Sequence, residues 1–120
     1  MKIGTDIIQI ARIEKLLEKY GESFKKRFLS DKEIASVKKI ESIAGYWAAK
    51  EAISKALGCG IGGRLSFHDI IIIKDSFGAP TFTLSSQAQN VHKISNASLS
   101  ISHDGGFAIA VAVINTKEKK

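Results

Sequence analysis

The sequence predicts an α+β fold in which an antiparallel sheet packs against helices, and three observations support this class. Helical patterns fill most of the N-terminal half, whereas short segments rich in isoleucine and valine dominate the C-terminal half. The C-terminal segments follow one another through short turns, which favours antiparallel neighbours over the long crossovers of a parallel sheet. The expected order is one strand, three helices, two strands, one short helix and two strands.

The chain begins with a short predicted strand and an amphipathic helix. The opening stretch KIGTDIIQI is rich in isoleucine, which is typical of strands. The helix is indicated by apolar residues that recur at helical spacing: Ile13, Leu16, Leu17 and Tyr20. We expect this helix to end at Gly21.

Two further helices are predicted before the middle of the chain. Ser30 and Glu33 fit a capping box, in which the two side chains satisfy the first free amides of a helix from about 31 to 40. The next helical segment covers about 42–57 and stops at Gly58, because glycine suits the left-handed position that ends a helix.

The C-terminal half contains four predicted strands and one short helix. Four consecutive isoleucines at 70–73 predict a strand too apolar to be exposed on either face. A turn at 75–80 leads into a second strand at 81–84, and a short helix from Ser86 to about Lys93 follows. The segments 98–103 and 107–114 are predicted to form a hairpin around Asp-Gly-Gly, since Asp-Gly tolerates the positive φ of tight turns.

Length and composition indicate one domain over residues 1–120, with residues 116–120 as a flexible tail. No segment has the roughly 18 consecutive apolar residues of a membrane span, and the N-terminus lacks the pattern of a secretory signal, so we expect a cytoplasmic protein without a membrane partner. Cys59 is the only cysteine, which excludes an intrachain disulfide.

The net charge of +6 indicates an acidic partner, and the segment 12–27 alone carries six basic and three acidic residues.

The stretch WAAKEAISKALG at 47–58 divides into two helix faces. Placed about 100° apart, its alanines and aliphatic residues form one continuous half that we expect to be core. The other half carries Trp47, Glu51, Ser54 and Lys55. Glu51 and Lys55 at i, i+4 are compatible with a surface ion pair worth about 0.3–0.5 kcal/mol, or with a site that faces a substrate.

Asp6 favours the second interpretation, because an aspartate within an apolar strand needs a cation or hydrogen-bond donors. Magnesium is usually held by one or two carboxylates together with phosphates and waters. Asp6 and Glu51 would therefore form half of a Mg²⁺ site that a phosphate ester completes, with Lys55 facing the same phosphates. The loop containing Gly58 and Gly60 would let a ligand approach the backbone closely. His103, beside a hairpin turn, is either a structural histidine or a substrate contact.

Several blocks of the sequence together resemble the holo-acyl-carrier-protein synthases, a family of small bacterial phosphopantetheinyl transferases. They span nearly the whole chain in the family's order: GTDIIQIARI, FKKRFLSDKE, WAAKEAISKALGCGIG, GAP at 78–80 and SISHDGGFAIAVAV. The third block resembles a highly specific family signature, whereas the Gly-x-Pro pattern carries little weight alone.

The resemblance implies the phosphopantetheinyl transferase fold and Mg²⁺-dependent transfer of 4'-phosphopantetheine from coenzyme A to apo acyl carrier protein, in support of fatty acid biosynthesis. It assigns catalysis to Asp6, Glu51 and Lys55, with the two carboxylates as the metal ligands. It assigns coenzyme A binding to these residues: Lys55, Gly58, Gly60, Gly78, Pro80 and His103. It also implies a homotrimer with coenzyme A between subunits, and docking of the acidic carrier protein on a basic first helix, here Arg12, Lys15 and Lys19.

Three positions depart from the family pattern. Tyr46 stands where arginine is common, so a phosphate or partner contact is missing or is supplied by Lys50 or Arg64. Trp47 replaces a phenylalanine and is expected to keep its packing role. Asp104 stands where small hydroxyl residues are common. The competing hypothesis is a noncatalytic basic module that binds nucleic acid, although the basic segment offers few aromatic residues for stacking.

Overall fold

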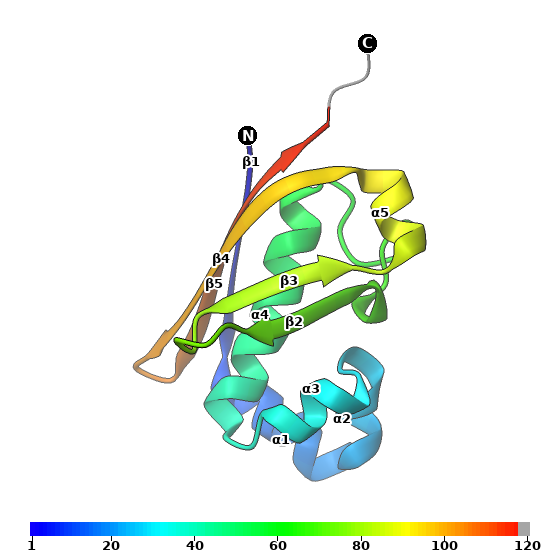
Figure 1. The fold of residues 1–120 in the computed structure, drawn as a ribbon. Helices are drawn as coiled ribbons and strands as arrows, with labels where there is room; N and C mark the ends of the chain where they lie inside the picture. Colours follow the sequence, from blue (N-terminus) through cyan, green and yellow to red (C-terminus); the bar gives the residue numbers. More distant parts are fainter. Residues whose placement is uncertain (118–120) are drawn as a thin grey trace.

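The computed structural model describes residues 1–117 and has the predicted α+β class, with helices packed against antiparallel strands (Figure 1). In chain order its elements are β1 (Lys2–Gln9), α1 (Ile10–Tyr20), α2 (Glu22–Phe28), α3 (Asp31–Ser36), α4 (Ile40–Ala56), the 3₁₀ turn η1 (Phe67–Asp69), β2 (Ile70–Lys74), β3 (Pro80–Leu84), α5 (Ser86–His92), β4 (Ile94–Asp104) and β5 (Phe107–Thr116).

The strands form two antiparallel sheets. The larger has the order β1-β5-β4, and the smaller pairs β2 with β3. In the larger sheet Asp6 lies opposite Ala110, which in turn lies opposite Ile101. His103 lies opposite Ala108, one rung of the same face further along. Because β5 is central, β1 and β4 form the two edges of this sheet, and residues of both edges can flank a helix laid over the middle.

Helix α4 is laid over this sheet (Figure 1), and small residues allow it to lie close. The side of β5 that faces α4 carries three successive alanines, Ala108, Ala110 and Ala112, all fully buried. On β1 the contact is tighter still, because a Cβ added at Gly4 would lie 1.9 Å from the carbonyl oxygen of Ala52. No side chain fits there, so glycine at position 4 is what permits the C-terminal half of α4 to rest on β1.

The N-terminal half of α4 lies against the other edge of the sheet. A Cβ added at Gly45 would lie 2.8 Å from Cγ2 of Ile101 on β4. Helix α4 therefore crosses the sheet obliquely, from β4 at its N-terminal end to β1 at its C-terminal end. This oblique placement decides which side chains of α4 meet which edge.

An aromatic cluster joins α4 to the N-terminal helices. The Trp47 ring lies 5.9 Å from that of Phe24, 5.1 Å from that of Phe28 and 4.9 Å from that of Phe67, measured between centroids. Such distances suit the offset and edge-on arrangements that aromatic rings prefer. The packing role expected for Trp47 is thus present in the fold.

Some predicted elements were wrong. Helix α2 was not predicted, because its seven residues are too few to show a helical period, and α3 ends at Ser36 rather than near residue 40. Strand β2 is not covered on both faces, since Ile71 and Ile73 are exposed. Of the expected tail, Thr116 ends β5 and the Lys117 N–H donates to the Lys93 carbonyl, whereas residues 118–120 lie outside the described part of the chain.

Candidate active site

Asp6 and Lys55, which are far apart in the sequence, form an ion pair. Asp6 lies in the middle of β1 on the side that faces α4, and Lys55 lies in the last turn of that helix. The Lys55 Nζ donates to Asp6 Oδ1 at 2.8 Å. The Asp6 side chain is only 13% exposed, whereas that of Lys55 is 52% exposed. Exposed pairs of this kind contribute about 0–1 kcal/mol, so the lysine is free to exchange its partner for another anion.

Glu51 lies one helical turn before Lys55 and completes the cluster. Burial raises the pKa of its carboxyl group, the negative charge of Asp6 raises it further, and the charge of Lys55 opposes both. The Lys55 pKa is raised, chiefly by its hydrogen bond with Asp6, so the lysine is charged at neutral pH. Two carboxylates that repel each other at a half-buried site provide a place where a divalent cation is stabilising.

These residues fit a magnesium ion that is shared with a ligand. Among residues 1–117 no three His, Cys, Asp or Glu side chains gather into a metal cluster. Asp6 and Glu51 offer two carboxylates. Mg²⁺ in phosphate-handling sites is commonly bound by one or two carboxylates, and phosphate oxygens and waters fill the remaining coordination positions. The donor set is therefore of the kind that suits Mg²⁺ and a phosphate ester.

The glycine loop after α4 leaves open space beside this cluster. Gly58 and Gly60 have φ values of 80° and 65°, and no atom lies within 4 Å of a Cβ added at either position. The Gly58 N–H donates to the Lys55 carbonyl and the Gly60 N–H to the Ser54 carbonyl, which closes the end of the helix. These two amides are occupied, so the loop favours a ligand through the room it leaves rather than through these N–H groups.

The other residues assigned to coenzyme A gather in a separate pocket of about 200 Å³. The β2–β3 turn contributes Gly78 and Pro80, and β4 contributes His103. The complete lining is Glu41, Ser42, Tyr46, Lys74, Gly78, Pro80, Ile101 and His103. Since ligand pockets usually measure about 300–1,000 Å³, this one has room for only a part of a molecule as large as coenzyme A.

The pocket and the Asp6 cluster lie on opposite flanks of α4. Asp6 and His103 face the same side of the sheet but lie on its two edge strands, which are about 10 Å apart, and His103 is displaced two residues further along the sheet. Around α4, Ser42 and Tyr46 lie about 140–180° from Glu51. The helix therefore separates the two groups of residues within one chain.

The basic residues predicted to dock a partner lie on one helix. Arg12, Lys15 and Lys19 are all exposed on α1, which starts at Ile10, immediately after the strand that carries Asp6. Only Ile13 of this helix is fully buried, on the side that faces the rest of the protein. The basic surface and the Asp6 cluster are thus connected by a few residues of chain.

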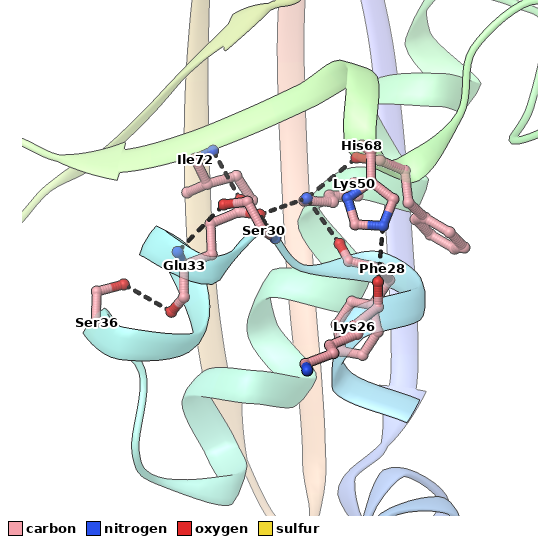
Figure 2. Close-up of polar contacts among 9 residues, drawn as sticks. Lys26, Phe28, Ser30, Glu33, Ser36, Lys50, His68 and Ile72 are labelled. Atoms are coloured by element: carbon pink, nitrogen blue, oxygen red, sulfur yellow. Dashed lines mark hydrogen bonds and ion pairs between the residues drawn. The ribbon is translucent and has the colours of Figure 1, made fainter. Parts of the chain in front are cut away.

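Neither Lys50 nor Arg64 compensates for the missing arginine at Tyr46. Lys50 is fully buried, and its Nζ donates to Glu33 Oε1 at 2.8 Å and to the carbonyls of Phe28 and Phe67 (Figure 2). Arg64 lines a different surface pocket, beside α5. The alternative in which Lys50 supplies this contact is therefore wrong, because its ammonium group is already bonded inside the fold.

Ser54 also differs from prediction. The helical periodicity predicts Ser54 on the outer half of the helix, but it is fully buried and its hydroxyl donates to the Glu51 carbonyl at 2.7 Å. Helical periodicity alone does not show that the chain after α4 turns back to this residue, where the N–H groups of Cys59 and Gly60 donate to the Ser54 carbonyl. The polar face that remains exposed is consequently narrower and is centred on Glu51 and Lys55.

With this geometry established, comparison with known proteins identifies the class. The sequence profile of the 4'-phosphopantetheinyl transferase superfamily matches residues 2–112. The chain belongs to this superfamily. Among the helices of residues 1–117, none is long and apolar enough to cross a bilayer.

Within the superfamily the chain is similar to proteins named holo-[acyl-carrier-protein] synthase. The one from Sulfurovum sp. (strain NBC37-1) is 68% identical over 115 residues, which cover 96% of this chain and 97% of the relative. The crystal structure of the Helicobacter pylori holo-[acyl-carrier-protein] synthase in complex with coenzyme A has a TM-score of 0.91 and 52% identity, covering 94% of this chain and 99% of that one. The Neisseria meningitidis synthase has a TM-score of 0.87 at 35% identity, covering 96% and 98%.

Proposed function

We propose that this chain transfers the 4'-phosphopantetheine group of coenzyme A to a serine of apo acyl carrier protein and releases adenosine 3',5'-bisphosphate. The observation that carries the proposal is the meeting of Asp6, Glu51 and Lys55 at one end of α4, in a chain 68% identical to a holo-[acyl-carrier-protein] synthase. We further propose that the reaction depends on Mg²⁺, takes place in the cytoplasm and supports fatty acid biosynthesis.

In the proposed reaction the serine oxygen forms a bond to the phosphorus that bears pantetheine. The bond from this phosphorus to the oxygen that bridges the pyrophosphate breaks, and the electron pair leaves with adenosine 3',5'-bisphosphate. Asp6 and Glu51 would hold a Mg²⁺ ion, which would neutralise charge on the pyrophosphate oxygens. Lys55 exchanges its contact with Asp6 for the pyrophosphate and stabilises the leaving charge, and the serine proton passes to a water oriented by the two carboxylates.

We also propose that the active unit is a homotrimer. The outer face of the larger sheet supports it, because this face exposes a set of large apolar residues: Ile3, Ile7, Phe107, Ile109 and Val111. Contiguous apolar surface of this kind is typical of subunit interfaces. In such an assembly the Asp6 cluster of one subunit would face the His103 pocket of a neighbour, so that coenzyme A binds across both.

A direct transfer assay tests the activity. The chain is incubated with apo acyl carrier protein, coenzyme A and MgCl₂, and the carrier is weighed by mass spectrometry. We expect the carrier to gain the mass of one phosphopantetheine group. Glu51→Gln is expected to abolish the gain and to keep the native circular dichroism spectrum, because the amide cannot replace a carboxylate that neutralises the metal.

The controls decide the meaning of a negative result. A known synthase must modify the same carrier preparation in parallel. If it does and this chain does not, the proposed function is wrong. If the Glu51→Gln variant stays fully active, the metal role of that carboxylate is wrong.

A further inference from the structure

The pocket around His103 contains a lysine, Lys74, although the position in its lining where the family commonly has arginine is occupied by Tyr46. Tyr46 lines this pocket in place of the common arginine and is almost completely buried. Burial raises the pKa of its phenol, so Tyr46 is neutral at physiological pH. A phosphate bound in the pocket therefore obtains no charge from this residue.

Lys74 supplies a cation to the same pocket. It is the last residue of β2, lies opposite Pro80 in the β2–β3 pair, and is exposed. Within residues 1–117 its ammonium group forms no ion pair with a carboxylate. The lysine is thus available to a ligand, in contrast to Lys50, which is buried in its pair with Glu33.

The turn that carries Lys74 is fixed by its own hydrogen bonds. Oδ1 of Asp75 accepts from the N–H groups of Phe77 at 2.8 Å and Ala79 at 3.0 Å. The neighbouring carboxylate is therefore engaged with backbone amides rather than with Lys74. Glu41 is the one carboxylate in the pocket lining, against two groups that can carry positive charge, Lys74 and His103.

Coenzyme A has two anionic parts, the pyrophosphate and the 3'-phosphate of the ribose. The pyrophosphate belongs at the reacting centre, with Lys55 and the two carboxylates. This centre lies on the other flank of α4, so the anion left for the His103 pocket is the 3'-phosphate. A phosphate monoester carries close to two negative charges at neutral pH, and a lysine binds it as a point charge.

We propose that Lys74 binds the 3'-phosphate of coenzyme A and makes the protein select coenzyme A over 3'-dephospho-coenzyme A. This inference rests on the proposed function, because it takes the His103 pocket to be part of the coenzyme A site. Lys74 takes the place of the cation that Tyr46 lacks. It acts on substrate choice and contributes nothing to the metal-binding cluster.

The test compares the two substrates in a Lys74→Met variant. One charge-assisted hydrogen bond corresponds to about a 10- to 100-fold effect, so we expect kcat/KM for coenzyme A to fall by about that factor. The value for 3'-dephospho-coenzyme A is expected to change less than about threefold, and Lys74→Arg is expected to keep most of the preference. Lys32→Met serves as the control, since Lys32 is an exposed lysine on the neighbouring face of α3 that does not line the pocket.

An equal loss for both substrates, or no loss for either, would overturn the inference. Calorimetry separates its failure from that of the proposed function, with adenosine 3',5'-bisphosphate and adenosine 5'-monophosphate as probes. If the wild-type protein transfers nothing but Lys74→Met selectively weakens binding of the bisphosphate, the proposed function fails and the Lys74 assignment stands. If transfer proceeds and the variant binds both probes as the wild type does, the Lys74 assignment alone fails.

Discussion

Replacement of Lys50 by methionine provides a sharp test of how the catalytic helix is held. Lys50 Nζ makes three hydrogen bonds inside the protein, at 2.8 Å to Glu33 Oε1, 2.8 Å to the Phe28 carbonyl and 3.1 Å to the Phe67 carbonyl (Figure 2). These contacts tie α4 to the end of α2, to α3 and to η1. Methionine fills a similar volume without a charge, so the variant removes the polar contacts with little change in packing.

The expected loss follows from what remains around Glu33. Its side chain is 1% exposed, and breaking a buried ion pair on one side costs about 3–5 kcal/mol. Glu33 keeps two donors, the N–H of Ser30 at 2.8 Å and the N–H of Ile72 at 3.0 Å. These bonds partly stabilise the carboxylate, so we expect the lower end of the range, a fall of about 3 kcal/mol in the free energy of unfolding.

Urea unfolding at one fixed protein concentration measures this loss, because the stability of an oligomer depends on concentration. A double-mutant cycle with Glu33→Gln isolates the ion pair, and the coupling between the two positions is expected to be about 1–3 kcal/mol. A fall of less than about 1 kcal/mol for Lys50→Met, with a native circular dichroism spectrum, would refute the assigned role of this pair.

Three further variants test other parts of the structure. Gly4→Ala places a Cβ against the Ala52 carbonyl, so we expect the free energy of unfolding to fall by about 1–3 kcal/mol and transfer activity to be lost. The control Gly62→Ala, with open space around it, should be close to neutral. Equal effects of the two substitutions would contradict the close packing of α4 on β1. Ile109→Glu should convert a trimer into monomers in sedimentation experiments, and an unchanged oligomer would show that the outer sheet face is not the interface. The pKa of Asp69 is lowered below its ordinary value of 3.8, chiefly by its hydrogen bond from the Ser66 N–H, so its contribution to stability is complete above about pH 4 and is lost as the pH falls through the lowered pKa. The stability difference between wild type and Asp69→Asn should therefore shrink in urea titrations below about pH 4, and a constant difference would contradict this.

The fold class could be predicted because helix periods, helix ends and caps are determined by residues close together in the sequence. The period of α1, its end at Gly21 and the capping box of Ser30 and Glu33 were all visible in the sequence and are present in the structure. Helix α2 was missed because seven residues give too little periodicity, and the division of the strands into two sheets depends on pairings that no local pattern encodes.

The candidate site was predictable in composition but not in arrangement. A carboxylate in an apolar strand drew attention to Asp6, and the structure brings Lys55 to it. The double role of Glu33 could not be foreseen, since its capping function is local whereas its partner Lys50 lies 17 residues away. The position of Lys74 beside His103 depends on how the smaller sheet meets the larger one, which only the folded chain reveals.

In the proposed homotrimer the Asp6 cluster of one subunit works with the His103 pocket of another, and mixing of inactive subunits tests this arrangement. Glu51→Gln disables the first part and His103→Glu the second, and each variant alone is expected to be inactive in the mass-spectrometric transfer assay. After the two are mixed in equal amounts, dissociated and reassembled, every mixed trimer contains one intact site, so activity should return to roughly a quarter of the wild-type value. Mixed trimers without any transfer activity, beside a fully active wild type treated in the same way, would contradict the claim.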